Sequence, residues 1–308
     1  MKLFKSATFW THLIVLFLVV VAIYLPSLHH GFILDDHIGV EQNLNIRNLD
    51  TVFNTPFSSF RSLLLHTSYS LGQLDPAYYR IMNIAFHLAT AVSVYVLVTL
   101  LVKNSSVAFF SVLIFAVHPI LTESIVWISS LTYPQYSFFA LVSLIFYILK
   151  EKSRQKATFV TLSLIAFILS ILSSEKALVL PVIFLLYEWL FGSMKKNWKL
   201  IVLSFLTIFA FGITIYPFVQ ERIFTFSATA VSGTTELLNP FVQIPVVLGT
   251  YIGLIFWPER LTIYHLDELG IQIIPLVISS VLTLIYFLSL IASYFKNKKI
   301  LFFLSIFF

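Results

Sequence analysis

The sequence predicts an all-α integral membrane protein, a polytopic helix bundle with about eight to ten membrane segments and outer-face loops that carry short helices. Of its 308 residues, 59% are hydrophobic and only 11% are charged, whereas a soluble domain carries about 25% charged residues. A chain this apolar has lipid as its solvent. The chain contains no Cys, which excludes disulfides, thiolate metal sites and Cys nucleophiles.

Nine apolar runs are candidates for crossing a bilayer, which takes about 20 residues. They are residues 9–27, 79–101, 105–122, 133–149, 157–173, 177–191, 200–219, 241–257 and 271–295. A tenth run, 300–308, is too short to span, so we expect the chain to be truncated there or that end to lie on the membrane. The first run lacks a small-residue cleavage site, which favours a retained anchor. We expect one transmembrane domain over residues 1–308.

Clusters of Lys and Arg predict the orientation, because short cytoplasmic loops are enriched in these residues. Clusters at 2–5, 103, 150–156, 195–199 and 296–299 hold 13 of the 19 basic residues. With these clusters in the cytoplasm, the first seven runs alternate in direction. The eighth run does not; it is short and contains Pro245. We expect it to be re-entrant or interfacial, with an ordinary span as the alternative.

Acidic residues gather on the other side in this topology, where 12 of the 14 fall. Asp and Glu contribute little to orientation, so their concentration on one face indicates chemistry or ligand binding there. The outer loops are expected at 29–78 and 220–270, the second including the re-entrant or interfacial segment. The basic clusters are short and scattered, which gives no signal for nucleic-acid binding.

Asp35 and Asp36 follow the first apolar run directly. Adjacent carboxylates beside an apolar surface can differ in pKa, so that one stays ionised and the other exchanges a proton. Such a group suits general-base catalysis on an attacking hydroxyl. A solvated loop pair or a helix cap is the alternative.

Arg80, Asn83 and His87 lie near the start of the second run, three and four residues apart, so they share one helix face. Polar groups inside a span usually face the bundle interior or a watery cavity. An interhelical hydrogen bond is the alternative to a binding role.

His118 and Glu123 flank Pro119 at the end of the third run, where proline interrupts the helix and frees a carbonyl. They are weak candidates, with Asp36, to hold a metal ion; a structural kink is the alternative. Glu175 and Lys176 form a short outer hairpin that suits phosphate or loop contacts, or is a plain surface turn. Arg260 suits phosphate recognition, or reaches the interface by snorkelling.

Read in order, these segments resemble the GT-C glycosyltransferases, and most closely the transmembrane half of the TPR-containing protein O-mannosyltransferase-like family. The resemblance covers nearly the whole chain. It rests on residues 31–37, 79–87, 116–123 (the family's HP…TE motif), 174–181, 239–241 and 257–262. The chain departs from the family at Ser130-Leu131, where Gly-Arg is usual, and at Ser174-Glu175, where Lys-Glu is usual.

The resemblance implies inverting transfer of a sugar from a polyprenyl-phosphate donor to a protein or glycan acceptor, on the non-cytoplasmic face. Asp35 or Asp36 would be the base. A cation would stabilise the leaving phosphate, and the candidates are Arg80, Lys176, Arg222 and Arg260. A divalent cation, Mg²⁺ or Mn²⁺, could do so instead, and no cofactor is certain. The family's TPR repeats are absent from these residues.

Two other functions stay open. A transporter or flippase of lipid-linked intermediates should show inverted repeats and midplane charges, and neither is evident. A non-catalytic membrane scaffold fits the departures at Ser130-Leu131 and Ser174. The short basic loops lead us to expect a bacterial inner membrane, with the active site facing outward.

Overall fold

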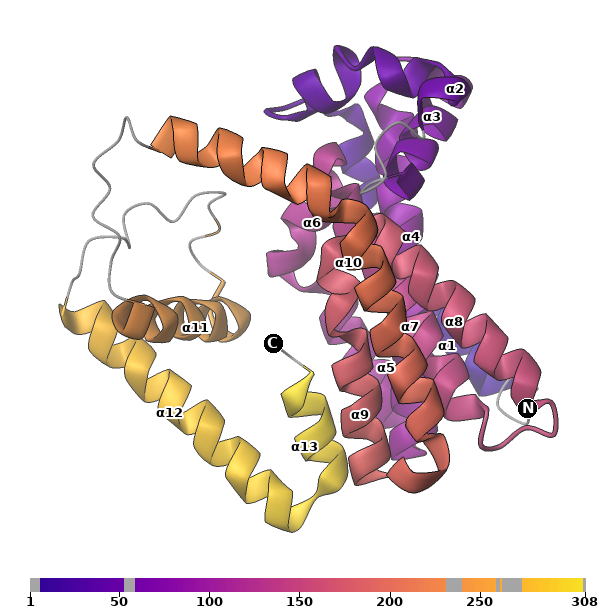
Figure 1. Ribbon diagram of the computed structural model, residues 1–308, viewed down its shortest axis with the longest axis vertical. Helices are drawn as coiled ribbons and strands as arrows, with labels where there is room; N and C mark the ends of the chain where they lie inside the picture. Colours follow the sequence, from indigo (N-terminus) through magenta and orange to yellow (C-terminus); the bar gives the residue numbers. More distant parts are fainter. Residues whose placement is uncertain (1–5, 53–58, 231–239, 259–260, 262–272, 307–308) are drawn as a thin grey trace. The chain divides into compact units, whose positions relative to one another are not determined.

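The computed structural model describes residues 6–52, 59–230, 240–258, 261 and 273–306, and the elements in these ranges are helical. Chain contacts divide it into two compact units, which are treated separately. The first comprises Met1–Leu185 and Met194–Ile208, and the second Leu186–Ser193 and Phe209–Phe308. The helices (Figure 1) are α1 Ala7–Tyr24, α2 Leu49–Val52, α3 Ser59–Gly72, α4 Pro76–Val102, α5 Ser105–Val117, α6 Thr122–Val126, α7 Thr132–Leu149, α8 Lys156–Ser173, α9 Leu180–Leu190, α10 Met194–Ala230, α11 Pro240–Phe256, α12 Ile273–Lys296 and α13 Lys298–Ser305.

The predicted class, an all-α polytopic membrane protein, is confirmed. Six described helices are long and apolar enough to cross a membrane, and α5 with α6 makes a seventh if that bent pair is one span. The six are Ala7–His29, Pro76–Val102, Ile128–Leu149, Lys156–Ser173, Met194–Pro217 and Val277–Lys296. The expected spans at 177–191 and 241–257 form the shorter helices α9 and α11.

Capping residues define both ends of α4 and the start of α5. Asp75 caps the start of α4 by accepting a hydrogen bond from the Ala77 N–H at 3.0 Å. The helix ends at Lys103, whose φ of 62° is left-handed. Asn104 then caps α5, accepting from Ser106 N at 3.0 Å and Val107 N at 3.1 Å. These caps satisfy backbone groups that the helix ends leave unpaired.

The bend predicted at Pro119 is present, because α5 stops at Val117 and the following helical segment departs by 52°. The segment from Pro119 to Thr132 contains α6 and two short 3₁₀ turns, Pro119–Leu121 and Ile128–Leu131. This interruption leaves carbonyl groups without their usual helical partners. The site described below forms around it.

Helices α7 and α8 form a hairpin joined by reciprocal hydrogen bonds. The Ser143 hydroxyl donates to the Ser163 carbonyl at 2.7 Å, and the Ser163 hydroxyl donates to the Ser143 carbonyl at 2.9 Å. Nearer the other end, the Ser170 hydroxyl donates to the Tyr136 carbonyl at 2.8 Å. Small hydroxyl residues let membrane helices approach closely, so the hairpin is a tightly packed pair.

In the second unit, α11 packs closely on α12. A Cβ added at Gly249 would lie 2.2 Å from the Ser279 Cα, so only glycine fits this crossing. The α12–α13 turn is held by the Tyr286 hydroxyl, which donates to the Leu304 carbonyl at 2.7 Å. Large apolar side chains such as Phe209 and Phe287 remain exposed on α10 and α12, as expected for helices that contact lipid.

The expected outer loop at 220–270 is only partly described. Helix α10 continues through Gln220 to Ala230, so the first part of this segment is helical. Residues 231–239, 259–260 and 262–272 lie outside the described residues. The re-entrant or interfacial placement of 241–257 stays a prediction.

Candidate functional site

Asp36 is the centre of a polar cluster at the end of the first unit where α4 and α7 begin. Its side chain is 0% exposed. One carboxylate oxygen accepts hydrogen bonds from the Ser129 N–H at 2.8 Å and the Ser129 hydroxyl at 2.7 Å. The other accepts from the Ile33 N–H at 3.3 Å. Asp36 therefore fixes the loop after α1 to the segment between α6 and α7.

Asp35, by contrast, is exposed. The turn from Ile33 to Asp36 contains Leu34 in a left-handed conformation, with φ at 46°, which costs a residue with a side chain about 1–2 kcal/mol. The Asp36 hydrogen bonds offset this cost. The same turn places one carboxylate inside the protein and leaves its neighbour open to an incoming molecule.

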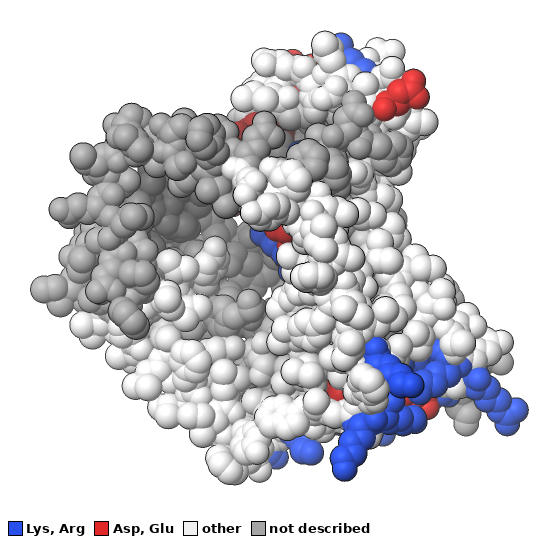
Figure 2. All heavy atoms as spheres, in the orientation of Figure 1, with Lys and Arg blue, Asp and Glu red and all other residues white. Residues whose placement is uncertain are grey.

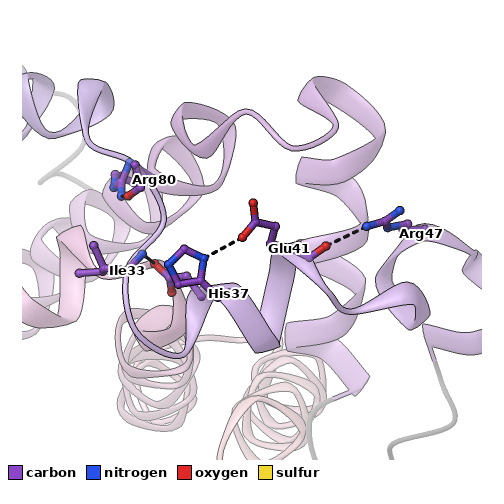
Figure 3. A network of polar contacts seen from close by, with 7 residues as sticks. Ile33, His37, Glu41, Arg47 and Arg80 are labelled. Carbon is purple, nitrogen blue, oxygen red and sulfur yellow. Dashed lines mark hydrogen bonds and ion pairs between the residues drawn. The ribbon is translucent and has the colours of Figure 1, made fainter.

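The chain after Asp36 folds as a π-helical turn, His37–Glu41. The His37 Nδ1 lies 2.7 Å from a Glu41 carboxylate oxygen, and Arg47 donates to the Glu41 carbonyl at 2.8 Å. Figure 3 shows these contacts running away from Arg80 and Ile33 along the loop. These contacts stabilise the turn that follows the aspartate pair.

Arg80 is fully buried, and its guanidinium donates hydrogen bonds to three backbone carbonyls. Its Nε donates to the Val126 carbonyl at 3.0 Å. Its two terminal nitrogens donate to the carbonyls of His30 and Gly31. Arg80 thus joins the start of α4 to the end of α6 and to the loop before Asp36.

Asn83 and His87 continue this polar face of α4, as their spacing predicts. The Asn83 amide donates to the Trp127 carbonyl at 2.9 Å, and the His87 Nε2 lies 3.1 Å from the Ala116 carbonyl. Together with Arg80, these two side chains form hydrogen bonds to backbone carbonyls on both sides of the break between α5 and α7. These are the interhelical contacts that the sequence left open as an alternative to binding.

Arg61, on α3, was not singled out from the sequence. Its Nη2 lies 3.5 Å from the Ser129 carbonyl. Its Nε is buried and has no hydrogen-bond partner in the described part of the chain. Burial lowers the pKa of the Arg61 guanidinium, and the negative charges of Asp36 and Asp35 oppose that shift.

The remaining candidates are less tightly grouped. His118 is half-buried, and its Nδ1 accepts from the Ile120 N–H at 3.2 Å, while Glu123 is exposed in α6. Among the described residues, no group of three or more His, Asp and Glu side chains could hold a metal ion. Asp36, His118 and Glu123 therefore do not assemble a metal site there.

Glu175 and Lys176 are exposed on the 3₁₀ turn after α8. The Lys176 Nζ lies 4.0 Å from the centre of the Tyr133 ring, in a cation–π contact. Because Tyr133 begins α7 just after Ser129, this lysine lies at the same end of the bundle as Asp36. Arg222 lies on α10, where its side chain is not described, and Arg260 lies outside the described residues.

The opposite end of the first unit is basic. There Glu151 pairs with Lys196 at 2.6 Å and with Lys156 at 3.6 Å. Hydrogen bonding to Lys196 lowers the pKa of Glu151. Figure 2 shows Lys and Arg gathered at this end, where α7 turns into α8. The exposed members are Lys152, Arg154, Lys195, Lys196 and Lys199.

Helix α7 connects these two ends. It runs from Thr132, beside the aspartate cluster, to Leu149, beside the basic cluster. Its 18 residues extend about 27 Å at 1.5 Å each, which is close to the hydrocarbon thickness of a bilayer. The aspartate cluster and the basic cluster therefore lie at opposite ends of membrane-spanning helices.

These features define a multi-pass helical membrane protein with a buried carboxylate–arginine cluster at the end of the bundle remote from its basic loops. The chain is similar to Protein O-mannosyl-transferase TMTC3 of Homo sapiens, at 34% identity over 124 residues, and to its Mus musculus counterpart, at 32% over 124 residues. Each match covers 35% of this chain and 13% of the relative. No family model and no solved structure matches the chain.

Proposed function

We propose that the protein is a membrane glycosyltransferase of the GT-C type, which moves a sugar from a polyprenyl-phosphate donor to a hydroxyl group of a protein. The observation that carries the proposal is the aspartate pair, with Asp36 locked by Ser129 and Asp35 left accessible. The partial similarity to a protein O-mannosyl-transferase supports mannose as the sugar and a protein as the acceptor.

The position of the cluster supports an active site on the non-cytoplasmic face. Short loops rich in Lys and Arg stay in the cytoplasm, and the basic end of the first unit lies at the far end of α7 from Asp36. A lipid-linked donor fits this arrangement. Its prenyl chain would lie among apolar helices while its phosphate and sugar reach the polar cluster at the interface.

The two carboxylates are suited to different tasks. Both oxygens of Asp36 already accept hydrogen bonds, so this residue positions the loop. Asp35 is exposed and would accept the proton from the acceptor hydroxyl, as a general base. The acceptor oxygen then forms a bond to the anomeric carbon from the side opposite the leaving group. The bond from that carbon to the phosphate oxygen breaks, and polyprenyl phosphate leaves with the electron pair.

The test is a transfer assay on membranes that contain the protein, with mannose radiolabelled on polyprenyl phosphate and a hydroxyl-bearing protein fraction as acceptor. We expect Asp35→Asn to lower transfer at least a hundredfold, the lower end of the contribution of a general base. Asp50→Asn is the matched control, because Asp50 is exposed in the same loop; it should transfer normally.

Normal transfer by Asp35→Asn would refute the role of Asp35 as base. Wild-type membranes that transfer no mannose to protein, but transfer another sugar or use a glycan acceptor, would correct the proposed substrates. Wild-type membranes that exchange a lipid-linked sugar between leaflets without any transfer would favour the flippase alternative.

A further inference from the structure

We propose that Arg61 is the residue that binds the phosphate of the lipid-linked donor, an inference that rests on the proposed function. The sequence pointed instead to Arg80, Lys176, Arg222 and Arg260. Among the described residues, Arg61 and Arg80 differ in how many of their N–H donors already have hydrogen-bond partners.

Arg80 has little capacity left for a ligand. Three of its nitrogens donate to three backbone carbonyls, and its side chain is 0% exposed. An arginine committed in this way holds the backbone in place. Its removal would unfold the break between α5 and α7 before it affected any substrate.

Arg61 has the opposite properties. A guanidinium offers five N–H donors in a rigid fork that matches phosphate geometry. In the described part of the chain its hydrogen bonding is one long contact to the Ser129 carbonyl, and its buried Nε has no partner. An unsatisfied buried donor carries a free-energy cost. A bound phosphate oxygen would remove that cost.

Two carboxylates oppose the effect of burial on the Arg61 charge, and residue 39 puts no side chain against the guanidinium. Asp36 and Asp35 favour its charged form through their negative charges. Gly39 contributes no side chain here, since an added Cβ would reach the Arg61 Nη2 at 3.7 Å and the Ser129 hydroxyl at 3.6 Å. The guanidinium therefore feels the charge of both carboxylates and has no side chain of residue 39 against it.

This placement suits the leaving group of the proposed reaction. Negative charge grows on the phosphate as the sugar leaves, and a fixed cation stabilises it. The negative charge of Asp36 also acts on this guanidinium. Arg61 would thus contribute both to donor binding and to the rate of transfer.

The experiment measures equilibrium binding to the purified full chain in detergent, with a C55 polyprenyl phosphate, the matching polyprenol and inorganic phosphate as probes. We expect the wild-type chain to bind polyprenyl phosphate more tightly than polyprenol. Arg61→Gln should weaken polyprenyl-phosphate binding about tenfold to a hundredfold, the range for a charge-assisted hydrogen bond, and leave polyprenol binding unchanged.

Two further variants keep the test decisive. Arg61→Lys retains the charge without the planar fork and should give an intermediate affinity; it carries the test if Arg61→Gln fails to fold. Arg47→Gln is the matched control, because Arg47 is an exposed arginine of the same loop that donates to the Glu41 carbonyl and lies 5.7 Å from the Tyr69 ring centre. It should bind like the wild type.

Equal affinity of wild type, Arg61→Gln and Arg61→Lys for polyprenyl phosphate would overturn the proposal, whether or not the protein transfers sugar. Equal wild-type affinity for polyprenol and polyprenyl phosphate would also overturn it. So would a result in which Arg61→Gln weakens the binding of inorganic phosphate as much as that of polyprenyl phosphate while the wild-type chain shows no preference for the lipid. Loss of transfer by Asp35→Asn with unchanged polyprenyl-phosphate binding would support the proposed function, and the affinity of Arg61→Gln decides the role of Arg61 separately.

Discussion

The hydrogen bonds between Asp36 and Ser129 should dominate the stability of the first outer loop, and a double-mutant cycle can measure them. Ser129→Ala removes the hydroxyl that donates to Asp36 at 2.7 Å and keeps the backbone N–H that donates at 2.8 Å. A hydrogen bond to a charged group contributes about 1.5–3 kcal/mol. We therefore expect Ser129→Ala to lower the free energy of unfolding by about 2 kcal/mol.

Asp36→Ala removes every acceptor at once. It leaves the Ile33 N–H, the Ser129 donors and two neighbouring guanidinium charges without their anion. Removing one partner of a buried charge pair costs about 3–5 kcal/mol. In the double variant the hydroxyl is no longer stranded, so we expect a coupling energy of at least 1 kcal/mol, within the range found for residues in contact.

The assay is reversible unfolding of the purified protein in mixed micelles, followed by tryptophan fluorescence, since Trp127 lies two residues before Ser129. Asp50→Ala, in the same loop, is the control and should change stability by less than about 0.5 kcal/mol. A coupling energy below about 0.3 kcal/mol between Asp36 and Ser129 would refute the geometry, because such values are typical of residues that do not touch.

Further predictions follow from other parts of the chain. Gly249→Ala should lower the melting temperature, because its Cβ would overlap Ser279, whereas Gly212→Ala meets nothing within 4 Å and should be neutral or slightly stabilising; equal melting temperatures would contradict the α11–α12 packing. The lowered pKa of Glu151 means that its stabilising contribution is present above about pH 4.3 and is lost as the pH falls through the lower folded-state value. Glu151→Gln should therefore reduce the difference in melting temperature between pH 7 and pH 4, and an unchanged difference would count against the pairing with Lys196. Because the chain has no Cys, single Cys residues at Asn45 and Lys152 should react with an impermeant maleimide from opposite sides of intact cells, and labelling from the same side would disprove the topology.

The sequence was sufficient to predict the class of fold, because apolar length and charge bias act locally. It also located the aspartate pair and the shared face of Arg80, Asn83 and His87, because a helix repeats every three to four residues. What these side chains bind could not be read from spacing. Their partners are carbonyls on either side of the break after Val117 and, for Arg80, also the carbonyls of His30 and Gly31.

Ser129 and Arg61 show where sequence reasoning stops. Ser129 contacts Asp36 across 93 residues of chain, and nothing in a single sequence links two such distant positions. Arg61 lies in the long loop expected at 29–78, where an arginine is unremarkable by composition. Only the packing of α3 beside the aspartate turn shows that its Nε is buried and without a partner among the described residues. The sequence predicted only short helices in this loop, and a short helix by itself does not indicate a contact.

The paired hydroxyls of Ser143 and Ser163 limit how the site can open. A slide of one helix along the other by a single turn, about 5.4 Å, would break both hydrogen bonds and remove these partners from the two hydroxyl groups. We therefore expect helices α7 and α8 to move together as one rigid unit. A movement that opens the first unit would therefore leave the α7–α8 pair intact, and the hydrogen bonds from Ser129 to Asp36 would resist a movement of the aspartate loop away from α7.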